Sequence, residues 1–116
     1  YGDEISGIFA GNNTTGTALA RAISEGGFGD RVAAVAIDAD TDEVEAVIDG
    51  SLDALIMRPD YWTVYNMMFD TIDSILNGTE YDKYIYCEYS TVTKEEIDSG
   101  NELLTADLYP ETMVRD

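Results

Sequence analysis

Three short apolar runs occupy the first half of the chain, and each gives way to a polar residue. The runs cover residues 5–10, 32–37 and 52–57, and the polar residues that follow them are Asn12, Asp38 and Arg58. Their length and composition are typical of buried β-strands. Pro59 follows the third run and prevents it from continuing as a strand. The pattern therefore predicts three strands, each ending at a hydrogen-bonding side chain.

Helical periodicity separates and follows these runs. The spacing of apolar residues predicts helices over residues 14–25, 41–49 and 60–77. We expect the inner faces of the first two helices to consist of Leu19, Ala22, Ile23, Val44, Val47 and Ile48. The third helix carries a wider apolar stripe, made of Tyr61, Val64, Tyr65, Met68, Phe69, Ile72, Ile75 and Leu76.

Capping residues predict where the helices begin and end. Asn13 or Thr14 is expected to cap the first helix, and Thr41 the second. Glycines that follow the periodic segments are expected to end the three helices. They lie at Gly26-Gly27, Gly50 and Gly78.

The second half of the chain adds a fourth strand and a short helix. Residues 83–92 are rich in Tyr, Ile and Val, which favour strands, and residues 94–98 form a helical turn capped by Thr93. Strands and helices thus alternate along the chain. That alternation predicts an α/β fold with three layers and a mostly parallel sheet joined by right-handed crossovers.

The chain is strongly acidic. It has 116 residues with 24 acidic and 6 basic side chains, so its net charge is -18. Nucleic acids and anionic lipids are bound by clustered Lys and Arg, and this balance therefore argues against both partners. The charge is interpreted as a solubilising surface, with an acidic patch for a basic partner as the alternative. The length is that of one domain.

Catalytic and metal-binding motifs are absent from the sequence. There is no histidine, and Cys87 is the single cysteine, so we expect no disulfide within the chain, no metal and no cofactor. We find no P-loop, serine-nucleophile motif or Cys–His pair, and we therefore expect no enzyme. No signal peptide or long apolar run is present. Because a core strand begins soon after Tyr1, we expect a piece of a longer protein.

Asn12, Asp38 and Arg58 are the candidate ligand-binding residues. In a parallel sheet the strand ends that carry them lie along one edge, where open α/β sheets bind ligands. An amide, a carboxylate and a guanidinium would suit the hydroxyls of a small polar molecule. The alternatives are helix capping for the first two residues, and pairing of Arg58 with Asp38 or Asp60.

Several motifs in this order resemble the last third of type I periplasmic sugar-binding proteins, whose scaffold is shared with the sensor half of lactose-repressor family regulators. The motifs are Gly7-Ile8-Phe9-Ala10-Gly11-Asn12-Asn13, Val35-Ala36-Ile37-Asp38-Ala39, Ile48-Asp49-Gly50-Ser51-Leu52-Asp53-Ala54-Leu55-Ile56, Ile75-Leu76-Asn77-Gly78 and Thr91-Val92-Thr93-Lys94-Glu95-Glu96-Ile97-Asp98. The family's ligand Asn and Asp match Asn12 and Asp38, whereas Arg58 stands where the family usually has Gln. The resemblance covers about residues 5–98.

The resemblance implies two lobes that close on a sugar. Residues 1–57 would belong to the C-terminal lobe, 58–60 to a hinge, 60–78 to a helix of the N-terminal lobe, 83–98 to the segment that crosses back, and 101–116 to a tail. Helix 60–78 would then be under-packed in this chain and could self-associate. We expect Phe9 in the core, and Tyr61 and Trp62 in core or hinge packing.

The function that the resemblance implies is that of an extracytoplasmic solute-binding protein, periplasmic or a cell-surface lipoprotein. It would deliver a small sugar to the permease of an ABC transporter and perform no catalysis. Two alternatives remain open at this point. One is the effector-binding domain of a lactose-repressor-type regulator or a sugar sensor, and the other is an enzyme with a flavodoxin-like half, in which Asp38 and Asp40 would serve a metal or phosphoryl site.

Overall fold

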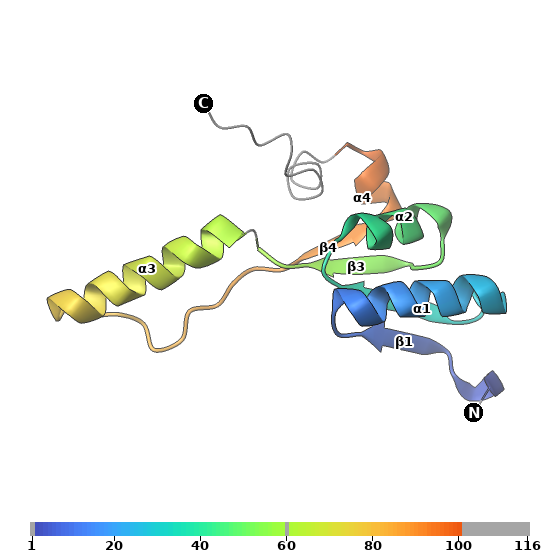
Figure 1. Ribbon diagram of the computed structural model, residues 1–116, viewed down its shortest axis with the longest axis horizontal. Coiled ribbons are helices and arrows are strands. Elements are labelled where there is room, and N and C mark those ends of the chain that lie inside the picture. The colour runs from blue at the N-terminus through green and yellow to red at the C-terminus, as the bar shows by residue number, and fades with distance from the viewer. Residues whose placement is uncertain (1, 60, 101–116) are drawn as a thin grey trace. The chain divides into compact units, whose positions relative to one another are not determined.

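The computed structural model describes residues 2–59 and 61–100, which divide into two compact units. One unit contains residues 2–57 and 91–100, and the other contains the described residues between 58 and 90. The elements are η1 (Gly2–Glu4), β1 (Gly7–Ala10), α1 (Asn13–Gly26), β2 (Ala33–Ile37), α2 (Thr41–Asp49), β3 (Ala54–Met57), α3 (Tyr61–Asn77), β4 (Ser90–Thr93) and α4 (Lys94–Asp98) (Figure 1). The tail, residues 101–116, lies outside the described residues.

The first unit is built on a sheet with the strand order β1-β2-β3-β4. β1 pairs with β2, and β2 with β3, in parallel, which confirms the α/β fold with a mostly parallel sheet. Because consecutive strands are neighbours, right-handed crossovers put α1 and α2 on the same face of the sheet. The two helices contact one another as well as the strands beneath them.

The core lies between this face and the two helices. Register places Ala10, Ala36 and Leu55 in one row across the strands, and Ala36 and Leu55 are both 0% exposed. The small side chains of Ala10 and Ala36 in this row let α1 approach the sheet closely. The other core residues are Leu19, Ala20, Ile23, Val32, Ala34, Val44, Ala46, Val47, Leu52 and Val92. Ala22 and Ile48, which we expected on inner helix faces, are exposed instead.

Phe9 is not a core residue, contrary to the prediction. Its side chain is 61% exposed. It projects from the sheet face opposite to α1 and α2, in the same row as Val35. Among the described residues of this unit, no helix covers that face, so only one of the two predicted helical layers is present. Strand alternation gave the face of Phe9 but not what covers it.

The segment that returns to the first unit is anchored on α2. Val92 in β4 is 1% exposed and belongs to the core cluster. Lys94 at the start of α4 donates from Nζ to the carbonyl oxygen of Ile48 at 2.8 Å. A cation there also compensates the negative end of the α2 dipole. As predicted, the side chain of Thr93 caps α4 by accepting from the amide of Glu96.

The predicted strand over residues 83–92 is wrong for most of its length. Only Ser90–Thr93 forms a strand, and it does so next to β3 in the sheet. Residues 83–89 have strand-favouring side chains but no regular secondary structure. Strand propensity depends on a neighbour to pair with, and the described residues of the second unit contain none apart from Ser90.

Helix α3 forms where the periodicity predicts it, but none of its described residues is buried. The apolar stripe that defines the helix in the sequence is largely exposed, and Phe69 and Leu76 illustrate this. The helix ends as expected at Gly78, which has a left-handed φ of 68°. Gly27 and Gly50 end α1 and α2 in the same way.

We predict that the row beneath the helices determines the stability of the first unit. Replacing Leu55 by Ala should lower the free energy of unfolding by about 2–5 kcal/mol, because it removes buried methyl groups and leaves a cavity. Phe9→Ala is the control, since it removes a larger side chain from the exposed face. Urea unfolding of this chain measures both, and equal losses in the two variants would contradict the assignment of the core.

Candidate functional site

Asn12 follows β1 and is the N-cap of α1. Its Oδ1 accepts from the amide of Thr15 at 2.9 Å and from the hydroxyl of the same residue at 3.0 Å. The prediction that Asn13 or Thr14 caps this helix is therefore wrong by one or two residues. The side-chain amide Nδ2 of Asn12 has no hydrogen-bond partner among the described residues, and the residue is exposed. Capping of α1 thus uses Oδ1 of Asn12 and leaves its Nδ2 able to donate to a ligand.

Asn13 joins the ends of β1 and β2. Its backbone amide donates to Oδ2 of Asp38 at 3.3 Å, and its Nδ2 donates to Oδ2 of Asp40 at 2.6 Å. The parallel register places these strand ends side by side, so residues 25 and 27 positions apart meet there. Sequence reasoning treated Asn13 only as a cap and missed this link.

Asp38 has a backbone conformation that few residues adopt. Its φ of 87° makes it the one residue other than glycine with positive φ among those described. Asp and Asn tolerate this region because their short side chains bond to nearby backbone groups. Its own amide donates to the carbonyl of Ile56 at 2.9 Å, which ties the turn to β3. Such strain is concentrated at functional sites, where the surrounding structure maintains it.

Arg58 follows β3 directly and begins the second unit. Its position as the third member of a shared rim stays a prediction, as does its role in ligand binding. Within α3, Tyr61 stacks on Tyr65 with ring centroids 6.3 Å apart, and Trp62 contacts Tyr65 edge to face with centroids 6.4 Å apart.

Glu43 in α2 is a buried carboxyl that sequence reasoning missed. It is 0% exposed, on a helix face that we expected to be formed by Val44 and Val47. Its Oε2 accepts from the amide of Asp40 at 3.3 Å, which is half of a capping box. Asp40, and not Thr41, is therefore the N-cap of α2.

Gly16 makes room for this carboxyl. A Cβ at Gly16 would collide with Oε1 of Glu43 and lie 2.9 Å from the Cβ of Ala36. The notch between α1, β2 and α2 is thus filled by an acid. Oε1 is buried and has no hydrogen-bond partner within the described structure. A glycine on the inner face of α1, one turn before Leu19, was the signal that could have indicated it.

The surroundings of Glu43 raise its pKa from 4.5 to about 7. Burial is the largest cause, and the charges of Asp40, Asp38 and Asp42 raise the pKa further. The hydrogen bond from the amide of Asp40 acts in the opposite direction. Burial disfavours the charged form of a carboxyl, and neighbouring negative charges do the same. Glu43 is therefore largely neutral below pH 7.

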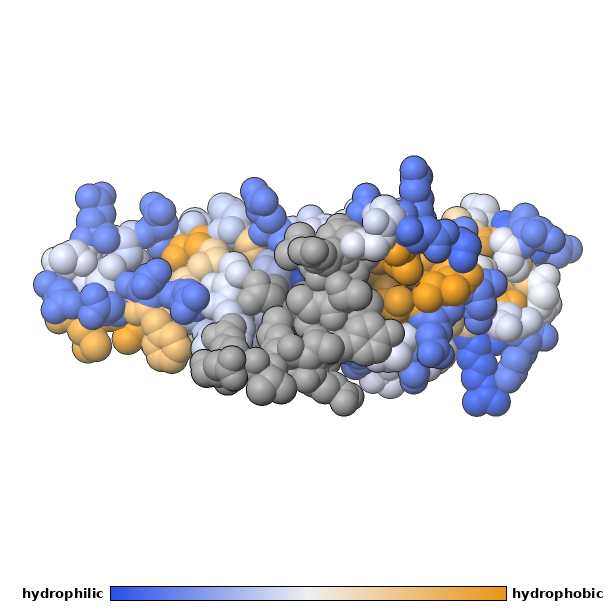
Figure 2. All heavy atoms as spheres, turned by 90° about the horizontal axis from the view of Figure 1, so that it is seen from above, coloured by the Kyte–Doolittle hydropathy of each residue, from blue (hydrophilic) through white to orange (hydrophobic). Residues whose placement is uncertain are grey.

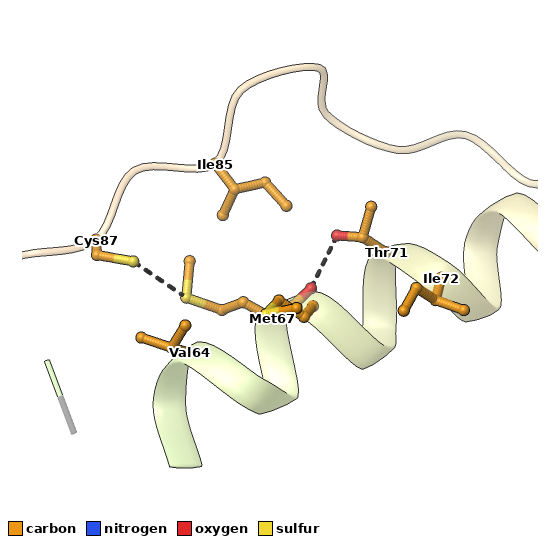
Figure 3. Close-up of a pocket in the computed structure, with 7 residues that line it drawn as sticks. Val64, Met67, Thr71, Ile72, Ile85 and Cys87 are labelled. Carbon is orange, nitrogen blue, oxygen red and sulfur yellow. Dashed lines mark hydrogen bonds between the residues drawn. The ribbon is translucent and has the colours of Figure 1, made fainter. Parts of the chain in front are cut away.

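The second unit contains an apolar pocket of about 400 Å³ between α3 and the segment that follows it (Figure 3). It is lined by Val64, Met67, Met68, Thr71, Ile72, Ile85 and Cys87. The hydroxyl of Thr71 donates to the carbonyl of Met67 at 2.8 Å, and the Cys87 thiol contacts the Met67 sulfur at 3.8 Å. Since its one hydroxyl is engaged within the helix, this pocket does not suit a sugar.

Other kinds of site find no support in the described part of the chain. No group of three or more His, Cys, Asp or Glu side chains there is arranged to hold a metal ion. None of the helices between residues 2 and 100 has both the length and the apolar character that a membrane crossing needs. The polar groups at the ends of β1 and β2 thus form the candidate site: Asn12, Asn13, Asp38 and Asp40.

Titration of Glu43 should make the stability of the fold depend on pH. The unfolded chain releases this proton near pH 4.5 and the folded chain near pH 7, so stability falls as pH rises through that window. Between pH 5 and 8 the loss should be about 2–3 kcal/mol.

Glu43→Gln should remove this part of the pH dependence, because an amide does not titrate. Glu45→Gln removes the same charge from an exposed position of α2 and should leave the dependence as it is. Urea unfolding of the three proteins at pH 5 and pH 8 gives the comparison. If the free energy of unfolding changed equally between pH 5 and pH 8 in Glu43→Gln and in the wild-type chain, a raised pKa at Glu43 would be contradicted.

Comparison with solved structures relates this geometry to known proteins. No protein-family model and no curated protein sequence matches the chain. An ABC transporter solute-binding protein from Agrobacterium vitis, with bound D-fucose, is similar with a TM-score of 0.72 and 30% identity. The match covers 90% of this chain and 35% of that one.

Two further structures have the same fold. A carbohydrate transporter solute-binding protein from Agrobacterium radiobacter, in complex with D-arabinose, has a TM-score of 0.71 at 24% identity, covering 86% of this chain and 34% of its own. A second solute-binding protein from Agrobacterium vitis, bound to α-D-tagatopyranose, has a TM-score of 0.73 at 19% identity, covering 90% and 34%. The chain therefore has the fold of the ABC-transporter sugar-binding proteins of type I, as its sequence motifs indicate, and spans about a third of their length.

Proposed function

We propose that this chain contributes one wall of a sugar-binding cleft in an ABC transporter solute-binding protein. The observation that carries the proposal is the polar cluster at the ends of β1 and β2, in a fold whose similar structures hold monosaccharides. The three similar structures described above are named as solute-binding proteins of transporters, which favours this role over a repressor domain. Binding and release of a sugar require no catalysis, so the proposed protein is not an enzyme.

Asn12 and Asp38 have complementary parts in the proposed site. Asp38 offers carboxylate oxygens to adjacent sugar hydroxyls, and hydrogen bonds to charged groups are the stronger kind. Asn12 offers its Nδ2 as a donor, because its Oδ1 is engaged by the cap of α1. A donor after one strand and a charged acceptor after the next would suit the hydroxyl pairs of a pyranose or furanose ring.

Arg58 is proposed as the residue that determines the charge of the ligand. Its guanidinium presents five donors and suits a sugar acid or a heavily hydroxylated sugar. It follows the third parallel strand, as Asn12 and Asp38 follow the first and second.

The complete protein is proposed to work outside the cytoplasm, in the periplasm or as a cell-surface lipoprotein, and to deliver its sugar to a membrane permease. The net charge of -18 supports a soluble carrier. Figure 2 shows hydrophilic side chains along the visible face of the molecule, with apolar patches between them. In the two-lobed protein, the exposed stripe of α3 would be covered by the first lobe.

We expect a monosaccharide or a sugar acid to stabilise the protein that carries this chain within a complete two-lobed fold. Thermal unfolding against a panel of neutral sugars, sugar acids and sugar phosphates identifies the ligand. A hundredfold excess over the dissociation constant adds about 2.7 kcal/mol. Preference for acids would support Arg58 as a ligand residue, and Arg58→Gln should then reverse it. A panel without any shift would contradict sugar binding.

Two substitutions test the site without disturbing the turns that carry it. Asp38→Asn removes the charge but keeps a residue that tolerates positive φ, and Asn12→Asp keeps the cap but removes the donor. In calorimetric titration Asp38→Asn should weaken sugar binding about 10- to 100-fold, the value of a hydrogen bond to a charged group. Asn12→Asp should weaken it about 3- to 10-fold, the value of a hydrogen bond between neutral groups. Thr14→Ala, at an exposed neighbouring position, is the control. Unchanged affinity in both variants would exclude this site.

In the absence of the first lobe, the apolar stripe of α3 could instead be covered by a second copy of the chain. Sedimentation equilibrium tests this self-association. We expect this chain alone to form dimers or larger species, because the stripe is largely exposed in the part of the chain that the structure describes, whereas the complete two-lobed protein should be monomeric. Asp substituted for Phe69 should shift the chain toward monomer. A chain that sediments as a monomer at all concentrations would contradict association through α3.

A further inference from the structure

The buried carboxyl of Glu43 is connected to the candidate sugar site by an unbroken series of hydrogen bonds. Glu43 Oε2 accepts from the amide of Asp40, and Oδ2 of Asp40 accepts from the side-chain amide of Asn13. The backbone amide of Asn13 donates in turn to the carboxylate of Asp38. Direct contacts therefore link Glu43 to a proposed ligand residue.

The notch that holds Glu43 fits a neutral acid better than an ion. Gly16 and Ala36, which lie on its α1 and β2 sides, carry no polar side chain, and the Asp40 amide contacts Oε2 alone. Oε1 is fully buried without a partner. An uncompensated charge in such a place is far more unfavourable than an unbonded neutral oxygen.

Within the described part of the chain, the charged groups that act on the Glu43 carboxyl are negative. Asp40 and Asp42 belong to the first turn of α2 and its cap, and Asp38 ends β2. α1 faces the carboxyl through Gly16. The basic residue of the other packed element, Lys94 of α4, donates to Ile48 at the opposite end of α2. Ionised Glu43 would therefore add a fourth negative group to the cluster.

We propose that Glu43 is a positioning residue that makes sugar binding depend on pH, because its protonated carboxyl keeps the loop of Asp38 and Asp40 in the binding geometry. Because Oε1 is buried without a partner in the described structure, loss of the proton favours movement of the carboxyl out of the notch. This movement takes Oε2 away from the Asp40 amide, although that amide itself favours the ionised form. The loop then loses one of the contacts that maintain the strained backbone of Asp38. This inference rests on the proposed sugar site.

Carboxyl carbon NMR tests the coupling without any sugar. In the protein that carries this chain within a complete two-lobed fold, the resonance of Glu43 should titrate near pH 7. The resonances of Asp38 and the amide of Asn13 should follow with the same midpoint. In Glu43→Gln the change of the Asp38 and Asn13 resonances near pH 7 should disappear, and in the matched control Glu45→Gln it should persist. The proposal would be overturned if the chemical shift of the Asp38 carboxyl carbon did not change as Glu43 titrates.

Calorimetric titration then tests the effect on binding, with D-fucose and D-arabinose as the first probes. If binding needs the protonated form, wild-type affinity should be about tenfold weaker at pH 8 than at pH 6. Glu43→Gln should bind equally well at both pH values, and Glu45→Gln should behave like the wild type. The proposal would be overturned if the sugar affinity of Glu43→Gln depended on pH as that of the wild type does. Absence of sugar binding together with coupled NMR titration would refute the proposed function alone.

Discussion

Parallel pairing of β1 with β2 is the constraint from which the candidate site follows. The register that aligns Ala10 with Ala36 also brings the two strand ends level, so that Asn13 reaches both Asp38 and Asp40. The same pairing requires crossovers, and the two helices that provide them close over one face of the sheet. Their approach in turn forms the notch in which Glu43 is buried. Core, cluster and notch are thus consequences of a single strand register.

Periodicity was sufficient to predict the architecture, and it failed where the outcome depended on something outside the local pattern. Strand ends followed by polar residues predicted that Asn12 and Asp38 would lie at neighbouring strand ends. The N-caps of α1 and α2 were misplaced toward the helix, because residues able to cap stand next to one another at both helix starts, whereas the cap of α4 at Thr93 was predicted correctly. The burial of Glu43 was not predicted, because it depends on the space that the missing side chain of Gly16 provides.

Exposure could not be predicted because it depends on neighbours that the sequence pattern does not specify. Phe9 alternates correctly along β1, yet the described elements of its unit leave its face uncovered. Residues 83–89 have the composition of a strand but become regular only near β3. The apolar stripe of α3 shows the same dependence, since it is evident in the sequence but none of its described residues is buried. In each case the side chains specify a preference, and the partner decides whether it is realised.

The positive φ of Asp38 limits what evolution can do at the centre of this cluster. Only glycine, asparagine and aspartate occupy such a backbone readily, so the accessible repertoire consists of a charged acceptor, a neutral amide or no side chain at all. A lineage that changes its ligand cannot install a hydroxyl, an aromatic ring or a basic group here without rebuilding the turn. A change in ligand specificity would have to come from residues with common backbone conformations, while position 38 keeps nearly the same chemical character.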